Sequence, residues 1–596
     1  MAEPCASPRE RSARPCVTEV LGIVVLLGVA IYFMGQSWRK WPDPIIDSGP
    51  QWYATWQVSL GAMPYHDFPW NYGPLSLFFN GLLFKIFGPG MMVLAWANLA
   101  VYAGIVVLGY FAFRLAWGKL GAFVALVVFI SAFSFSLLNS VGNYNYVLPY
   151  ANETTHGMLL LLVTALVGVR WSRKVSFRGA LWLGLCGGTA AVLKPEFMLA
   201  AGMVGIAALV LRYWQHQPVR IAEFGLLALG VVLPTLAFAG WFARGESWKT
   251  ALSDASQAWS VLVNQGVGQM PDESSYMGYD FLSRNAGFEA EAAFTGLLVV
   301  GAIWAACWFL NRPWPPLLRF VAALAAAFLA FSVNMGGGFE IGPCFPGLIA
   351  MVFIVVMVEM SAEWRRTRRF ERRTLMTLVL VLLAGTMLAR MALRARINHF
   401  GFIQAALAGM VIAAMLMTRI PRWTGRGIWG QRLATAGILI LLANCGSSIV
   451  TESYRNHRSQ TQPVGFGPDR FYAFDARQDE TGSVVNWCAD KMRAAPANAT
   501  LLVLPEGVMI NYLSRHKRAM PEYQTNMVEE DYIKHMAQVR PDYVILIWGD
   551  QRDGGMPKFG VMGQPGEHIV NWLKSGYLLV DSHKESTKSA LIVRRK

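Results

Sequence analysis

Three common kinds of functional motif are missing from this sequence. Its seven cysteines form no CxxC pair and no metal-type spacing, which excludes a zinc-finger-like site. No basic stripe with interleaved aromatic residues accompanies the formal net charge of +15, so we expect no nucleic-acid partner. The region after residue 450 contains neither GxGxxG nor a P-loop, and nucleotide binding there has no support.

Charge is also scarce for a chain of this length. Asp, Glu, Lys and Arg make up 15% of the 596 residues, whereas 54% are hydrophobic and the mean hydropathy is +0.37. Apolar runs of about seventeen or more residues recur along the chain, which is the length needed to cross a bilayer. The sequence therefore predicts a mainly α, polytopic membrane protein, with membrane and transmembrane helix as its first keywords.

The apolar runs predict about thirteen membrane spans. The N-terminal "MAEPCASPRERSARP" is basic and is followed by no small-residue cleavage site, so the first run is expected to stay as a span. The predicted spans lie near residues 17–34, 90–112, 120–138, 156–169, 179–193, 196–211, 221–243, 293–311, 318–333, 346–360, 374–393, 400–418 and 433–450.

Loop charges predict which loops lie on which side. The segments "RWSRKVSFR", "EWRRTRRFERR" and "RIPRWTGRGIWGQR" are rich in Lys and Arg, as cytoplasmic loops are. The alternate loops "NSVGNYNYVLPYANETTH" and "NMGGGFEIGPCFP" have no Lys or Arg, and the large outer loop 244–292 has seven acids against three bases. One gap disagrees, because Arg390, Arg394 and Arg396 fall outside; either a span is miscounted or these cations have a function there.

With thirteen spans, the C-terminal region 451–596 emerges on the outer side of the membrane domain 1–450. Its pattern is that of a soluble α/β domain: a helix at "TGSVVNWCADKMRAA", strands at "ATLLVLPE" and "PDYVILIW", and a final hairpin at "GYLLVDS" and "KSALIVRRK". This arrangement predicts a bacterial inner membrane protein with its C-terminal domain in the periplasm.

The first outer loop, 36–89, contains two segments too short to span a bilayer. "PQWYATWQVSLGAMPY" repeats Trp52, Trp56 and Leu60 at helical spacing, and we expect this aromatic face to lie on the membrane surface. "PLSLFFNGLLFKIFG" is apolar but only about fifteen residues long, and it predicts a second interfacial helix. Together they would hold Asp47 and Asp67 outside the membrane.

The polar residues that interrupt the apolar pattern gather at the predicted outer ends of the spans, whereas span interiors are nearly free of them. A transporter or pump would carry ionisable residues deep inside its spans. The distribution favours a site at the outer membrane boundary, next to a lipid-anchored substrate. The candidate residues are Asp43, Asp47, Asp67, Glu153, His156, Lys194, Glu196, Glu340, Arg396 and His399.

The first loop, "DSGPQWYATWQVSLGAMPYHDFPWNYGPLSLFFNGLLFKIFG", together with "VLKPEFMLA" and "EIGPCFPGL", resembles the GT-C membrane glycosyltransferases. The resemblance is to the aminoarabinose transferases of lipid A and the protein O-mannosyltransferases. It implies a glycosyltransferase that takes a sugar from a polyprenyl-phosphate donor and passes it to a glycan, lipid or protein acceptor of the cell envelope.

The resemblance also implies roles for individual residues. Asp47, in the first outer loop, matches the catalytic carboxylate of the superfamily, and Asp67 is a second catalytic candidate. Lys194, in "LKPE", matches a Lys at an outer helix end and is the first candidate for the donor phosphate, with Arg390, Arg394 and Arg396 second. We expect substrate binding from Glu153, His156, Lys194, Glu196, Glu340, Arg396 and His399.

At two positions the sequence departs from these families. Asn71, Tyr72 and Gly73 stand where aminoarabinose-type enzymes carry an acidic residue and a Lys, so a divalent metal ion stays an open question. Asp47 is followed by Ser48 where the mannosyltransferases have an Asp-Glu pair, so the acceptor class does not transfer.

Ordinary structural roles remain open for the same residues. Asp47 suits a turn or a helix N-cap, Asp67 a turn, and Glu153 the start of a helix. Lys194 has the length to snorkel at a span end. For the whole chain the alternatives are a flippase of lipid-linked glycans, a non-catalytic envelope scaffold and, within the same chemistry, an oligosaccharide ligase or polymerase.

Overall fold

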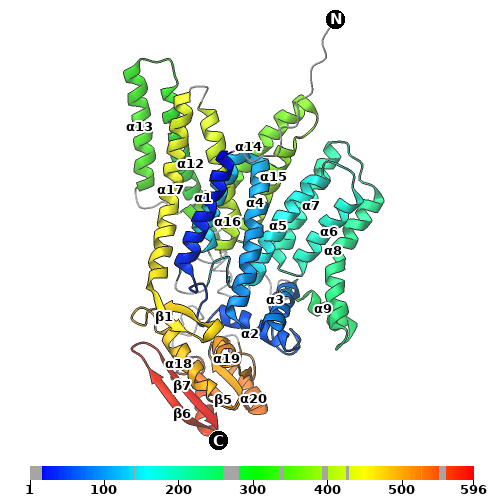
Figure 1. Cartoon of the computed structure of the whole chain (residues 1–596), viewed down its shortest axis with the longest axis vertical. Helices are drawn as coiled ribbons and strands as arrows, with labels where there is room; N and C mark the ends of the chain where they lie inside the picture. The colour runs from blue at the N-terminus through cyan, green and yellow to red at the C-terminus, as the bar shows by residue number, and fades with distance from the viewer. Residues whose placement is uncertain are drawn as a thin grey trace.

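The protein is mainly helical, and its long helices run side by side (Figure 1). The computed structural model describes residues 17–139, 143–259, 281–335, 341–391, 401–424, 428–524, 527–548 and 559–596. Within these ranges, ten helices are long and apolar enough to cross a membrane. The chain is therefore an integral, multi-pass membrane protein.

Each predicted span overlaps a helix or a continuation of one. The long helices are α1 (Val17–Ser37), α4 (Met91–Val128), α5 (Asn152–Trp171), α6 (Phe177–Ala191), α7 (Pro195–Trp214), α8 (Ile221–Phe242), α12 (Leu282–Leu310), α13 (Pro316–Met335), α14 (Ile341–Thr367), α15 (Arg372–Ala389), α16 (Gly401–Trp423) and α17 (Ile428–Ser459). Helix α6 and the described part of α13 are shorter than the other candidates, and the number of thirteen crossings stays a prediction.

Helix α4 contains two of the predicted spans, because its chain folds back on itself at Gly118. This residue has φ 79° and ψ −174°, which no helix contains. In a straight helix, residues 109 and 126 would lie about 25 Å apart. Instead, the Leu126 side chain packs directly against Gly109. The segment up to Trp117 and the segment from Lys119, continued by a π-helix at Phe129–Ser134, thus form an antiparallel helical hairpin.

The first loop forms two helices, α2 (Ser48–Ser59) and α3 (Pro74–Phe87), as the sequence predicts. The prediction that the aromatic face of α2 lies on the membrane surface is wrong. Trp52 and Trp56 are 2% and 8% exposed, and Trp52 packs against residues of the C-terminal region. Leu60 is exposed after the helix ends. Burial between protein layers and burial in a bilayer produce the same aromatic spacing, so the sequence pattern does not separate them.

The C-terminal region forms a mixed α/β fold, and the predicted helix, strands and hairpin are confirmed. Its main sheet has the order β4-β3-β5-β7-β6. Strand β3 runs parallel to its neighbours β4 and β5, whereas β7 runs antiparallel to its neighbours β5 and β6. Its elements are β1 (Gln460–Val464), a 3₁₀ turn (Gly467–Asp469), β2 (Phe471–Phe474), α18 (Thr481–Arg493), β3 (Thr500–Leu504), α19 (Val508–Ser514), β4 (Lys517–Arg518), α20 (Glu529–Val539), β5 (Tyr543–Trp548), α21 (Glu567–Gly576), β6 (Tyr577–Lys584) and β7 (Ser589–Arg595).

Helix α19 fixes this region to the membrane helices, next to α2 (Figure 1). Trp52 of α2 makes ring contacts with Phe471 and Tyr512, at centroid distances of 5.9 and 5.5 Å. Asp469 accepts hydrogen bonds from the first backbone amide of α4, at Met91, and from the Tyr512 hydroxyl, at 2.7 and 2.9 Å. The C-terminal region is therefore docked on the first loop and on the start of α4.

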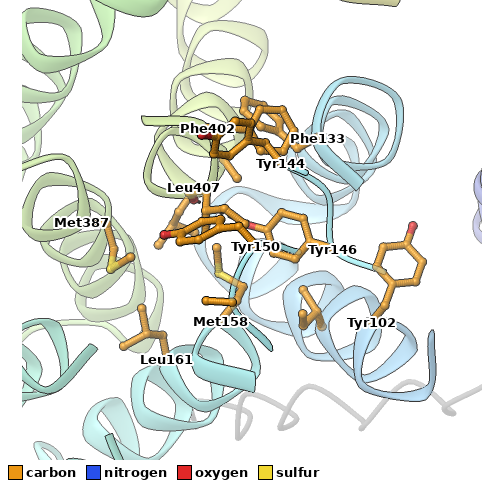
Figure 2. Close-up of a cluster of buried hydrophobic side chains, with 14 of the residues drawn as sticks. Tyr102, Phe133, Tyr144, Tyr146, Tyr150, Met158, Leu161, Met387, Phe402 and Leu407 are labelled. Carbon is orange, nitrogen blue, oxygen red and sulfur yellow. Dashed lines mark hydrogen bonds between the residues drawn. The ribbon is translucent and has the colours of Figure 1, made fainter. Parts of the chain in front are cut away.

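The connection between the π-helix and α5 is buried although it is not helical. Figure 2 shows Tyr144, Tyr146 and Tyr150 of this segment among side chains of α4, α5, α15 and α16. Backbone polar groups buried in such a place need partners. The Asn145 carboxamide oxygen accepts the amides of Val147 and Leu148, at 3.0 and 2.8 Å. The asparagines of "NYNYVLPYAN" thus hold the segment in shape.

Candidate active site at the helix starts

Asp47 stands at the start of α2 and does not cap it. The Asp43 carboxylate makes the preceding turn, where it accepts the amides of Ile45 and Ile46 at 2.8 and 2.5 Å. Asp47 occupies the N-cap position of α2, but its side chain makes no capping hydrogen bond. The capping role that the sequence allowed is therefore not realised, and the half-buried carboxylate is available to other groups.

The buried connection before α5 supplies the next neighbours of Asp47. The backbone amide of Asn143 hydrogen-bonds to the Asp47 carboxylate, and the Asn143 side chain donates to Ser48 Oγ at 3.2 Å. Burial and the nearby Asp43 raise the pKa of Asp47 to about 8; Glu506 adds to the rise, whereas Asn143 and Lys194 oppose it. The sequence places Asp47 correctly in the first loop, but it does not reveal this proton affinity.

Lys194 lies at the N-cap position of α7 and is 3% exposed. Its ammonium donates to the Tyr150 hydroxyl at 3.2 Å and lies 4.7 and 4.8 Å from the ring centres of Tyr72 and Tyr150. Glu196 Oε1 is 3.4 Å away. Burial alone lowers the pKa of Lys194, but Glu196, Tyr150 and Tyr72 together outweigh it, and the net pKa lies above the usual value. Lys194 is therefore a buried, permanently charged cation.

Arg390 continues this chain of charges. Its Nη1 lies 2.7 Å from Glu196 Oε1, and the charge of Glu196 is the main reason why the pKa of Arg390 is raised. Lys194, Glu196 and Arg390 thus alternate in sign along one row. Of the three cations that the charge pattern did not explain, Arg390 has an acidic partner; Arg394 lies outside the described residues.

The start of α3 is held against the turn between α6 and α7. The amides of Gly73 and Leu75 donate to the carbonyls of Leu193 and Val192, at 2.9 and 3.2 Å. A Cβ on residue 73 would overlap the Val192 carbonyl, so this approach needs glycine. The approach brings Tyr72 over Lys194. The sequence "NYGP" therefore positions a ring and not a charged pair.

Glu153 and His156 lie on the first two turns of α5. Glu153 is fully buried, and neither carboxylate oxygen has a hydrogen-bond partner within the described part of the chain. Lys194 is the cation that acts on it most strongly. His156 Nδ1 lies 2.8 Å from Ser76 Oγ, which ties α5 to α3. The structure thus brings Glu153 into the charged cluster and places His156 at the neighbouring helix contact.

Asp67 is not brought to this cluster by any interaction that the structure shows. It is exposed, and its two oxygens are occupied by the Met63 amide at 2.7 Å and by His66 at 2.8 Å. These partners hold its pKa below the usual value. Its catalytic role stays a prediction, and Glu340, Arg396 and His399 lie outside the described residues. Among the residues that the structure does describe, no three His, Cys, Asp or Glu side chains are arranged to hold a metal ion.

Four helices begin around the cluster, namely α2, α3, α5 and α7. Gln51, in the first turn of α2, accepts from the first residue of α5, Asn152, at 3.0 Å. The contacts of Gly73 and Lys194 join the starts of α3 and α7 to them. Helix starts carry partial positive charge, so their convergence favours an anionic ligand.

Sequence reasoning missed Tyr72, Tyr150 and Glu506 as members of this site. Neither tyrosine was among the candidate residues, because Tyr near a span end usually belongs to the aromatic belt of the membrane surface. Glu506 lies two residues after the end of the buried strand β3, and an acid just after a buried strand was the available signal. Nothing in the sequence indicates that this strand end meets the first loop.

Comparisons with known proteins give structural matches only. No protein-family model and no curated protein sequence matches the chain. The apo crystal structure of the Archaeoglobus fulgidus oligosaccharyltransferase matches with a TM-score of 0.45 at 12% identity, over 88% of this chain and 69% of that one. The same archaeal protein in complex with an inhibitory peptide and a dolichol-phosphate gives 0.45 at 11% identity, over 89% and 70%.

A second protein covers nearly the whole chain. ArnT from Cupriavidus metallidurans, bound to undecaprenyl phosphate, matches with a TM-score of 0.41 at 12% identity, over 96% of this chain and 97% of that one. Both proteins are similar to this chain in structure, at low sequence identity.

Proposed function

We propose that this protein is a glycosyltransferase that moves a sugar from a polyprenyl-phosphate donor to an acceptor hydroxyl at the outer face of the membrane. The observation that carries the proposal is that a carboxylate of raised pKa, Asp47, and a buried cation whose charge acts on it, Lys194, lie where four helices begin. An acid-base group and a phosphate-binding group are what this transfer requires.

Asp47 is the proposed general base. The acceptor oxygen attacks the anomeric carbon, the bond from that carbon to the phosphate oxygen breaks, and its electron pair stays on the phosphate. The acceptor proton passes to the Asp47 carboxylate. A base whose pKa lies near the working pH combines proton affinity with a useful ionised fraction, and about 8 is in that range. Such a base contributes roughly 100- to 10,000-fold.

Lys194 and the surrounding helix starts are the proposed phosphate site. The leaving phosphate gains negative charge as the bond breaks, and a fixed cation lowers the energy of that state. The Tyr72 and Tyr150 rings hold the ammonium in place, while Glu196 and Arg390 form the next part of the row. Glu153, unpaired and next to Lys194, is proposed to accept hydrogen bonds from the sugar hydroxyls.

The polyprenyl chain needs an apolar surface beside this site. Helix α3 supplies one, because Phe79, Leu82, Ile86 and Phe87 are all between 43% and 69% exposed. The same helix is joined to the site through Gly73 and Tyr72. A lipid tail lying along α3 would therefore place its phosphate near Lys194.

The test compares wild type with Asp47→Asn in lipid nanodiscs. Both receive a panel of polyprenyl-phosphate sugars and a membrane extract as acceptor, and Asp531→Asn, which removes an exposed carboxylate on α20, serves as control. We expect transfer by wild type and by the control, and a loss of at least about 100-fold in Asp47→Asn. Unchanged transfer by Asp47→Asn would remove the general base. If wild type transfers no sugar but moves a lipid-linked glycan across the bilayer of proteoliposomes, the protein is instead a flippase.

A further inference from the structure

The start of α19 in the C-terminal region is locked against the start of α2. A Cβ on Gly49 would overlap the backbone nitrogen of Met509, so the two chains are in direct contact. The Tyr53 hydroxyl accepts the Arg518 amide at 2.8 Å, and Trp52 packs on Tyr512. These contacts fix the position of α19 relative to the first loop.

The turn that precedes α19 is fixed as well. The amides of Gly507 and Val508 both donate to Glu522 Oε1, at 3.1 and 3.2 Å. The turn follows β3, whose side chains are buried in the sheet. Glu506 lies in this turn and is half-buried. It stands three residues before Met509, as Asp47 stands two residues before Gly49, and the negative charge of Glu506 acts on Asp47.

Charged groups of both signs act on Asp47. The negative ones are Asp43, from the turn before α2, and Glu506, from the C-terminal region. The positive one is Lys194, at the start of α7, which lies over the ring of Tyr72. The cation suits the donor phosphate. The carboxylates suit groups that donate hydrogen bonds, and they repel anions.

We infer that Glu506 binds the acceptor substrate, and that it selects hydroxyl-bearing acceptors that are neutral or cationic over anionic ones. The C-terminal region thus contributes a specificity-determining residue to the site and is not only a cover over it. This inference rests on the proposed sugar transfer, because it assigns the second substrate of that reaction.

The test uses full-length protein in nanodiscs, with the donor that supports transfer and membrane extract as acceptor. Glu506→Gln keeps the shape and removes the charge; Glu530→Gln removes an exposed charge from α20 of the same region and is the control. For Glu506→Gln we expect the acceptor KM to rise about tenfold or more, because a hydrogen bond to a charged group is lost. The donor KM is expected to stay within twofold, and Glu506→Asp to recover part of the acceptor affinity.

Charge selection is measured with three competitors of one scaffold: methyl glucoside, methyl glucuronide and methyl glucosaminide. Wild type is expected to be inhibited least by the glucuronide, by a margin of about tenfold, and Glu506→Gln to reduce that margin. An acceptor KM within twofold of wild type, or an unchanged margin, overturns the inference while the proposed function stands. A wild type that transfers no sugar from any donor overturns both.

Discussion

The ammonium of Lys194 lies 4.7 Å from the centre of the Tyr72 ring, and the two residues come from separate loops that meet through the backbone of Gly73. This contact joins the first loop to the start of α7. It desolvates Lys194 on one side while the ring face interacts favourably with its charge. The cation is therefore positioned before any substrate arrives.

Replacing Lys194 by Met removes the charge and keeps most of the volume. We expect sugar transfer to fall about 100- to 1,000-fold, as when one group that stabilises developing charge is lost. Steady-state kinetics with the active donor measures the change. The control is Lys85→Met, which removes an exposed lysine from the end of α3. A fall of less than fivefold would contradict the phosphate role.

The pH dependence of transfer reports the ionisation of Asp47. Because only the carboxylate accepts a proton, kcat/KM is expected to rise with pH up to an apparent pKa of about 8 and then level off. Glu506→Gln removes one of the negative neighbours, so its profile should move to lower pH. The measurement is made with donor and acceptor both below their KM values. A kcat/KM that does not change between pH 6 and 9 would show that ionisation of Asp47 does not control transfer.

Ionisation of Asp47 is expected to raise the rate of transfer but to lower the stability of the folded protein. The pKa of Asp47 is about 8 in the folded protein and near 3.8 when unfolded, so the folded state binds the proton more tightly. Its contribution to stability is fully present below pH 3.8 and is lost as the pH rises through 8. Asp47→Asn should therefore melt at a higher temperature than wild type at pH 9. Equal melting temperatures at pH 9 would contradict the raised pKa.

In the row of Lys194, Glu196 and Arg390, the ion pair between Glu196 and Arg390 is the shorter, at 2.7 Å. The Arg390 side chain is 32% exposed. Glu196 still has Lys194 as an ion-pair partner when Arg390 is removed. We therefore expect Arg390→Gln to lower the free energy of unfolding by about 1–3 kcal/mol, which is less than the loss when an isolated buried ion pair is broken. The double variant with Glu196→Gln should lose less than the sum of the single losses by at least about 0.5 kcal/mol. Additive losses in a denaturation series would show that the pair is not coupled.

Gly49→Ala tests the docking of the C-terminal region. The added Cβ overlaps the Met509 backbone, so the contact has to open, at a cost of about 1–3 kcal/mol. We expect faster proteolysis near the junction after Ser459 and weaker acceptor binding. Gly28→Ala in α1, where a Cβ meets no neighbour, is the matched control. Equal proteolysis of both variants would contradict the proposed contact.

Helix positions could be predicted from the sequence because apolar length is a strong local signal. The reversal at Gly118 was also within reach, since separate spans were expected on its two sides. The C-terminal strands followed from buried runs such as "ATLLVLPE". These features depend on neighbours along the chain and not on contacts at long range.

The composition of the site could be predicted only in part. Asp47, Glu153, Lys194 and Glu196 were expected at outer helix ends, and the structure gathers them. Glu506 was missed, because its approach depends on the packing of α19 against α2. Trp52 was assigned to the lipid surface for the same reason. A residue pattern shows that a side chain is buried, but not which partner buries it.

The contact between Gly49 and Met509 has a consequence for biosynthesis. Asp47 leaves the ribosome early, whereas the α19 that completes its surroundings is among the last segments to be made. Domains generally fold in the order of synthesis. The proposed catalytic group would therefore stay incomplete until every membrane helix has been inserted and the C-terminal chain has folded against the first loop. If the proposed function holds, a partly inserted protein has no means of consuming the donor.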